Sequence, residues 1–361
     1  MLQNTQTPRE TLKVGFVALA DCAPLVMAQE LGLFAAHGLD VELHREIGWA
    51  TMRDKIIYGE LHAAQAPAGL VVSANCGLGC IQADCLTGLV LNLHGNAITL
   101  SSELWKVGVR DGPSLRTEIE RGKRHYTFGV VHPFSSHNIL LRNWLRANRI
   151  VSNVRIVVVP PAQMHANIKA GNLDGYCVGE PWNSVAVLSK AGWCVATSAE
   201  LAPGHIEKVL MVRREFAETS RDSHLALIAA LAEACRYCDE LQNRNAIVDI
   251  LSRREFVGAS RESLRLSLSA DGFNFGNGRI EPEPDFHIFA NGNANEPTLE
   301  RAQWLIRGLH ATGIVSDPAS APLAKAAEWF RRDIFKQALN RAPKYPVEAV
   351  RETVLGTAAK L

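Results

Sequence analysis

The feature that most constrains this chain is a repeated alternation of short apolar strands and helical segments. The run LKVGFVAL is typical of a strand, and APLVMAQELGLFAAHG after it has a helical pattern that ends at a glycine. The middle of the chain repeats this order, with YTFGVV, VRIVVV and DGYCVG as strands separated by helical stretches. Such alternation predicts an α/β fold of parallel sheets with helices on both faces.

The second half of the chain has a different pattern. After KVLMV we expect mostly helices, at 222–241, 244–252, 260–269, 297–312 and 323–358, and a long loop rich in Gly, Asn and Pro at 271–297. Two α/β units with helices returning at the end predict two lobes, with 11–106 plus 210–361 as lobe I and 107–209 as lobe II. Two lobes of this kind face a cleft, where small ligands bind near helix N-termini and the carboxyl ends of strands.

Composition and charge narrow the classes of function. Of the 361 residues, 47% are hydrophobic and 21% charged, which suits a core large enough for about two domains. The 38 basic residues nearly balance the 37 acidic ones, so no broad cationic field favours nucleic-acid binding. No apolar run reaches the roughly 18 residues of a membrane span. The N-terminus shows no charged-then-apolar export pattern, so we expect a cytoplasmic protein.

Motifs for catalysis and cofactors are missing. The chain contains no G-x-x-x-x-G-K-[ST], no strand-linked G-x-G-x-x-G and no G-x-S-x-G. His132, His137 and Cys177 could in principle build a Cys–His site, but nothing local orders them. We therefore expect no enzyme activity and no cofactor.

The cysteines do not form a convincing metal motif either. Cys76, Cys80 and Cys85 have C-x3-C and C-x4-C spacing, whereas zinc sites usually use four ligands in paired short-spaced motifs. We expect the eight cysteines to be mainly free thiols in a reducing compartment, with no metal site.

Four hydrogen-bond donors stand at predicted junctions of strands and helices. Trp49 precedes a helix, Asn96 lies between two strand-like runs, His137 opens a helix after YTFGVV, and Lys208 begins KVLMV. Helix N-termini favour anions, and indole, amide, imidazole and ammonium donors would surround a small oxyanion. Each residue also has a structural alternative: Trp49 in the core, Asn96 in a turn, and His137 and Lys208 at the surface.

Three longer segments strengthen the anion-binding hypothesis. They are LKVGFVALADCAPLVMAQELGLFAAHGLDVEL, GWATMRDKIIYGEL and VVPPAQMHANIKAGNLDGYCVGEPWN. With them, the chain resembles the nitrate-binding family of periplasmic-type solute-binding proteins over about residues 11–340. The resemblance implies a two-lobe, periplasmic-binding-protein-like fold of type II, with nitrate or nitrite in the cleft between the lobes.

The same resemblance implies roles for individual residues. The ligand contacts would be Trp49, Asn96, His137 and Lys208, with Asn96 one methylene shorter than the glutamine that the family carries there. The cleft wall and supporting positions would be Ser136, Pro161, Gln163, Glu180 and Pro181. Bicarbonate-binding relatives carry an acidic residue in place of the lysine. Because nitrate has acceptor oxygens and no proton to donate, Lys208 predicts nitrate or nitrite rather than bicarbonate.

Within that family, the chain most resembles the branch of cytoplasmic nitrate/nitrite sensors. The partner of such a sensor is an RNA-binding antiterminator of the NasT type, with an ANTAR domain. The implied function is that ligand binding releases this partner and allows expression of nitrate-assimilation genes, without direct contact between the sensor and nucleic acid. The alternative is the nitrate-binding component of an ABC transporter. The loop 271–297 and the C-terminal helices are candidates for the partner-binding face.

Overall fold

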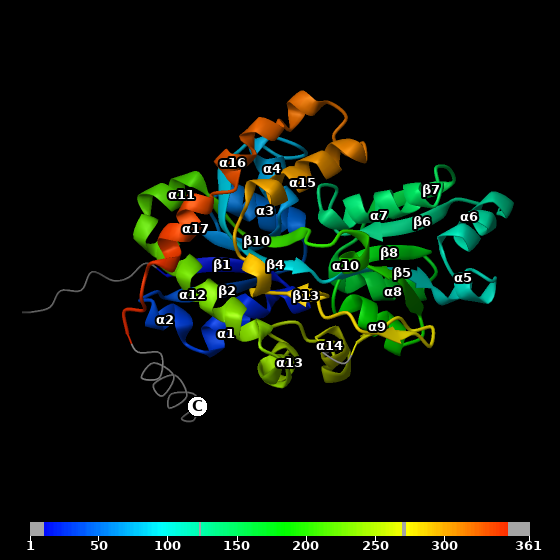
Figure 1. The fold of residues 1–361 in the computed structure, drawn as a ribbon, viewed down its shortest axis with the longest axis horizontal. Coiled ribbons are helices and arrows are strands. Elements are labelled where there is room, and N and C mark those ends of the chain that lie inside the picture. Colours follow the sequence, from blue (N-terminus) through cyan, green and yellow to red (C-terminus); the bar gives the residue numbers. More distant parts are fainter. Residues whose placement is uncertain (1–10, 123, 269–271, 346–361) are drawn as a thin grey trace, which may run out of the picture.

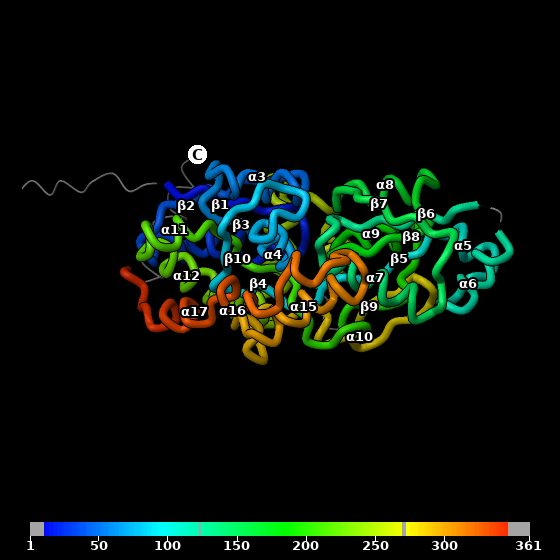
Figure 2. The backbone as a smooth tube through the Cα atoms, turned by 90° about the horizontal axis from the view of Figure 1, so that it is seen from above, coloured from blue at the N-terminus to red at the C-terminus, as the bar shows by residue number. Residues whose placement is uncertain are grey.

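Two lobes lie side by side in the computed structural model, which describes residues 11–122, 124–268 and 272–345 (Figure 1). Each lobe is built on one sheet, with six strands in lobe I and five in lobe II. Seen from above, the same two bodies follow one another along the long axis (Figure 2). The two-lobe α/β architecture predicted from the sequence is confirmed.

Lobe I combines parallel and antiparallel strands. In sheet order they are β13 (His287–Ile288), β4 (Cys85–His94), β10 (Ile206–Arg213), β3 (Ala63–Pro67), β1 (Leu12–Val17) and β2 (Val41–Glu46). β1 pairs in parallel with β2 and β3, whereas β10 is antiparallel to both β3 and β4. β4 is buried along its whole length, as expected for a central strand that is covered on both faces.

Helices cover both faces of this sheet, and their apolar stripes form its two core layers. One layer is formed by α1 (Ala23–Glu30), α2 (Leu33–Ala36), α12 (Arg221–Asp239) and α17 (Arg332–Leu339). The other is formed by α3 (Trp49–Ile57), α4 (Gly69–Asn75), α15 (Leu299–Ala311) and α16 (Ala326–Trp329). The second layer contains the helix whose first residue is Trp49.

Lobe II has the same layered plan. Its strands in sheet order are β7 (Val154–Val158), β6 (Tyr126–Val130), β8 (Gly175–Gly179), β5 (Asn96–Ser101) and β9 (Gly192–Thr197). One face packs against α5 (Ser102–Lys106), α6 (Gly112–Arg121) and α7 (Ser136–Ala147). Residues of α8 (Met164–Lys169) and α9 (Trp182–Leu188) belong to the core that continues into lobe I.

The strands of the two main sheets are connected at two places. The first crossing is at Gly95, between β4 and β5, where φ is +87° and a Cβ would lie 2.3 Å from the ring of His287. Only glycine fits such a position. The return runs from α10 (Ser198–Leu201) to β10. The strands therefore change sheet at 94–96 and 201–206, whereas the expected lobe boundaries were 106/107 and 209/210.

The crossings also explain why the sheets are mixed rather than parallel. β5 is antiparallel to β8 and β9, and β10 is antiparallel to its two neighbours. Each of these strands enters its sheet directly from the other lobe, without a crossover helix, so it need not run parallel to its neighbours.

The C-terminal third is largely helical, as predicted, but the segment 323–358 is not one helix. It contains a 3-10 turn (Leu323–Lys325), then α16 and α17, and the part beyond 345 lies outside the described residues. The other helices here are α11 (Arg214–Thr219), α13 (Arg244–Leu251) and α14 (Arg261–Ser267). The described part of the expected loop 271–297 contains β13 and a small hairpin of β11 (Phe273–Asn274) and β12 (Ile280–Glu281). None of the helices in the described ranges is long and apolar enough to span a bilayer.

Candidate functional site

Trp49 is the first residue of α3 and is buried against the core of lobe I. Gly48 before it has extended backbone as the N-cap, so the helix begins at Trp49 itself. The indole Nε1 is buried and has no hydrogen-bond partner within the part of the chain that the structure describes, although a buried indole N–H usually finds one. Lys208 Nζ lies 5.4 Å from the centroid of the indole ring. Two of the four predicted ligand contacts are thus neighbours.

Lys208 is fully buried and held between two carboxylates. Its Nζ lies 2.9 Å from Asp21 Oδ2 and 2.6 Å from Glu207 Oε1. Asp21 is fixed in turn by Gln65, whose Nε2 donates to Asp21 Oδ1 at 2.5 Å. Burial by itself lowers the pKa of Lys208, but the two carboxylates outweigh it and raise the pKa above its ordinary value. Lys208 therefore carries its charge inside the protein.

Glu207 is the residue that the sequence reasoning missed. Neighbours in a regular strand point to opposite faces, which would separate Glu207 from Lys208. However, the register of β10 against β4 shifts between Ile206 and Lys208 and again between Lys208 and Val209. Such an irregularity changes the direction in which neighbouring side chains point. As a result, the two adjacent side chains meet in one buried cluster.

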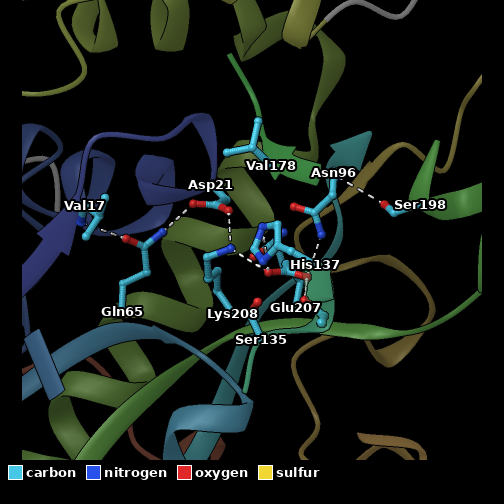
Figure 3. Close-up of polar contacts among 12 residues, drawn as sticks. Val17, Asp21, Gln65, Asn96, Ser135, His137, Val178, Ser198, Glu207 and Lys208 are labelled. Carbon is cyan, nitrogen blue, oxygen red and sulfur yellow. Dashed lines mark hydrogen bonds and ion pairs between the residues drawn. The ribbon is translucent and has the colours of Figure 1, made fainter. Parts of the chain in front are cut away.

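The Glu207 carboxylate accepts hydrogen bonds from three residues. Lys208 Nζ donates to Oε1 at 2.6 Å, Asn96 Nδ2 donates to Oε2 at 2.6 Å, and Ser136 Oγ also donates to Oε2. Asn96 and Ser136 belong to lobe II, whereas Glu207 and Lys208 belong to β10 of lobe I. The carboxylate therefore joins the two lobes (Figure 3).

His137 is the second residue of α7 and is fully buried. The helix begins as predicted, because Ser135 caps it by accepting from the backbone N–H of Asn138 at 3.4 Å. His137 Nε2 lies 3.6 Å from Glu207 Oε1, and neither ring nitrogen has a hydrogen-bond partner in the described ranges. Burial lowers the pKa of His137 to about 3, so the imidazole is neutral at pH 7.

Asn96 is fixed at the start of β5, directly after the crossing glycine. Its backbone N–H donates to Ser198 Oγ at 3.1 Å, and its side-chain Oδ1 is buried without a partner. The structure therefore brings all four predicted ligand contacts into one buried cluster, and Figure 3 shows three of them, Asn96, His137 and Lys208. The arrangement differs from the expectation at Asn96, because its amide donates to Glu207 within the protein.

Two of the predicted supporting residues, Glu180 and Pro181, lie where the lobes meet. The Glu180 N–H donates to Gly95 O at 3.1 Å, and its carbonyl accepts from the N–H of Ala20 in lobe I at 2.7 Å. Its buried carboxylate accepts from Ser267 Oγ of α14 at 2.9 Å. Burial raises the pKa of Glu180 to about 7. Pro181 follows as the N-cap of α9.

Pro161 and Gln163 lie further along lobe II. Pro161 is buried as the first residue of a 3-10 turn before α8, whereas the side chain of Gln163 is exposed. No hydrogen bond among the described residues joins either of them to the cluster around Glu207.

The electrostatics of the cluster change one sequence-based argument. Lys208 was expected to distinguish nitrate from bicarbonate by its free positive charge, but Asp21 and Glu207 already neutralise that charge. Burial also lowers the pKa of the nearby His205 to about 4, so it adds no positive charge at pH 7. The ammonium alone therefore does not select nitrate over bicarbonate.

The cluster contains buried donors that have no hydrogen-bond partner among the described residues. Trp49 Nε1 is a donor only, and a neutral imidazole offers one N–H. Within the described ranges, no group of three or more His, Cys, Asp and Glu side chains has the geometry of a metal site, and Cys76, Cys80 and Cys85 are free thiols. What these residues can do chemically is surround a small molecule that has several acceptor atoms.

The chain is similar to several known proteins. Residues 5–252 match the NMT1-like family. Two curated relatives are 38% identical over 85% of the chain: the nitrate import ATP-binding protein NrtC of Synechocystis and the bicarbonate transport ATP-binding protein CmpC of Synechococcus elongatus. The chain spans about half the length of these two relatives, 47% and 46%. The crystal structure of the periplasmic nitrate-binding protein NrtA from Synechocystis matches with a TM-score of 0.87 and 26% identity, over 95% of this chain and 91% of that one.

Proposed function

The chain belongs to the NMT1-like family, and on that premise we propose that it is a solute-binding protein that encloses nitrate or nitrite between its lobes. The observation that carries the proposal is a pair of buried side chains beside Lys208. Trp49 Nε1 and both ring nitrogens of His137 have no hydrogen-bond partner among the described residues.

The energetic argument favours a ligand with acceptor atoms. A buried polar group without a partner costs about 1–3 kcal/mol, and several such groups at one place are rare in folded proteins. Nitrate has three acceptor oxygens in a plane and could accept from the Trp49 indole, the His137 imidazole and the Lys208 ammonium. The first N–H groups of α7 have no partner within the helix and would favour the negative charge. Similarity to nitrate-binding NrtA supports the same ligand.

Bicarbonate is a second candidate, because one buried acceptor is also unused. Asn96 Oδ1 could accept from the O–H of bicarbonate, which nitrate does not possess. The relatives named for nitrate import and for bicarbonate transport are equally similar to this chain. Overall similarity therefore does not decide between the two anions.

The first test is direct binding. We expect calorimetric titration at pH 7 to show one saturable site for nitrate, with bicarbonate weaker at equal concentration and chloride without measurable heat. Nitrite should compete with nitrate for the same site. Tighter binding of bicarbonate than of nitrate would make bicarbonate the preferred ligand. Failure of both anions to bind would contradict the proposed anion-binding function.

The cellular role is a further part of the proposal. One relative is named for nitrate import and another for bicarbonate transport, and this favours a role as the nitrate-binding component of an ABC transporter over the sensor role first expected from the sequence. The sensor hypothesis, of the NasS type with an ANTAR-domain antiterminator as partner, predicts a stable complex that nitrate dissociates. Gel filtration of the purified protein with such an antiterminator, with and without saturating nitrate, tests it. Fractionation of the native host tests the predicted cytoplasmic location.

A further inference from the structure

Glu207 introduces a buried negative charge into a site for an anion. The carboxylate is fully buried and stays ionised: burial by itself raises its pKa, but the charge and the hydrogen bond of Lys208 outweigh that effect and hold the pKa well below its usual range. An ionised carboxylate within hydrogen-bonding distance of the only buried cation of this cluster must affect every anion that approaches that cation.

The charged and titratable groups around Glu207 come from four elements. β10 contributes Lys208, the segment before it His205, α7 His137, and the turn before α1 Asp21, which lies on the other side of Lys208. With both imidazoles neutral at pH 7, one ammonium faces two carboxyl groups. The cluster itself therefore supplies no excess positive charge for a ligand.

This balance treats singly and doubly charged anions differently. A Coulomb interaction scales with the charge of the ligand, so repulsion by Glu207 is twice as large for sulfate as for nitrate at the same position. The neutral donors Trp49 and His137 carry no net charge that would repel either anion, and they can donate to the acceptor oxygens of both.

We propose that Glu207 determines the charge selectivity of the site, so that it accepts singly charged oxyanions and rejects doubly charged ones such as sulfate. This inference rests on the proposed function. Glu207 also orients Lys208, Asn96 and Ser136, but an orienting role affects the binding of both anions in the same direction. The ratio of the sulfate affinity to the nitrate affinity therefore isolates the effect of charge.

The test uses Glu207→Gln, which removes the charge and keeps the size. Asn96 can adapt to the new amide, because its unpartnered Oδ1 can accept from the Gln nitrogen after rotation of the side-chain amide. Calorimetric titration with sodium nitrate and sodium sulfate at pH 6 and constant ionic strength gives the two affinities. For wild type we expect sulfate to bind at least a hundredfold more weakly than nitrate, and for Glu207→Gln we expect the sulfate-to-nitrate ratio to rise at least tenfold.

Two variants serve as controls. Glu207→Asp keeps the charge and should leave the ratio within about twofold of wild type, even where both affinities fall. Glu180→Gln removes another fully buried glutamate that contacts Ser267 rather than Lys208. Because the pKa of Glu180 is about 7, it is largely protonated at pH 6, and the substitution should leave the ratio unchanged.

The possible results separate this inference from the proposed function. If wild type binds nitrate and the sulfate-to-nitrate affinity ratio is unchanged in Glu207→Gln, the charge-selectivity role of Glu207 is contradicted. The proposal that the protein binds nitrate is then unaffected. If Glu207→Gln does not fold, the wild-type measurement still decides, because comparable affinities for sulfate and nitrate would overturn the inference. Absence of nitrate binding to wild type removes the proposed function and this inference together.

Discussion

The indole N–H of Trp49 provides the sharpest test of the proposed site. Trp49→Phe removes the N–H and keeps an aromatic ring beside Lys208. A hydrogen bond to a charged group contributes about 1.5–3 kcal/mol, and 1.4 kcal/mol corresponds to a tenfold change in affinity. If the N–H donates to the bound anion, nitrate should bind about 10- to 100-fold more weakly to the variant.

The folded protein itself should tolerate this change. Trp49 Nε1 has no partner to lose, so removing it relieves an unpaired buried donor, while the smaller ring leaves a modest cavity. These two effects oppose each other, and we expect the free energy of unfolding without nitrate to change by less than about 2 kcal/mol. Loss of affinity in Trp49→Phe would then reflect the site and not the fold.

The chain offers a matched control in Trp193. Its Nε1 is also buried without a partner, but the ring packs against Trp105 in the core of lobe II, with centroids 5.0 Å apart. Trp193→Phe removes the same atoms and should change the nitrate affinity by less than about threefold. Both variants are compared by calorimetry at pH 7. Unchanged affinity in Trp49→Phe, or an equal loss in Trp193→Phe, would refute the reasoning.

Three further predictions concern stability. Lys208→Ala should lower the free energy of unfolding by about 3–5 kcal/mol in urea titrations, because it leaves the carboxylates of Asp21 and Glu207 buried without their cation; a change below 1 kcal/mol would contradict the buried ion pairs. Burial raises the pKa of Glu180 from 4.5 to about 7, so the folded protein keeps a proton that the unfolded chain loses, and this group makes the protein less stable as pH rises from about 4.5 to 7. Glu180→Gln cannot lose stability in this way, so its free energy of unfolding relative to wild type should increase by about 3 kcal/mol between pH 4 and pH 8 in matched urea titrations. A difference between the two proteins that does not change with pH would contradict the raised pKa. Nitrate at a hundred times its Kd should stabilise the protein by about 2.7 kcal/mol, seen as a higher Tm, and an unchanged Tm would contradict binding to the folded state.

Local patterns in the sequence predicted the elements well, and their pairing less well. The cap at Ser135 and the start of α7 follow from residue types that act within one helical turn. The direction of β5 and β10 depends instead on where the chain crosses between lobes, and the strand–helix alternation contains no information about that. The expected lobe boundaries consequently lay several residues away from the crossing at Gly95.

The candidate site also shows that local sequence patterns do not predict how strands pair, here for a single side chain. A family resemblance predicted Trp49, His137 and Lys208 as ligand contacts, and the structure places them in one buried cluster, although residue patterns alone left each with a structural alternative. Glu207 could not be predicted as part of the cluster, because strand periodicity assigns it to the face opposite Lys208. The shifted register of β10 reverses that assignment and places the carboxylate among the donors. A residue next to a predicted ligand contact at the start of a strand should therefore be examined as a site residue, because irregular pairing there brings both neighbours to one face.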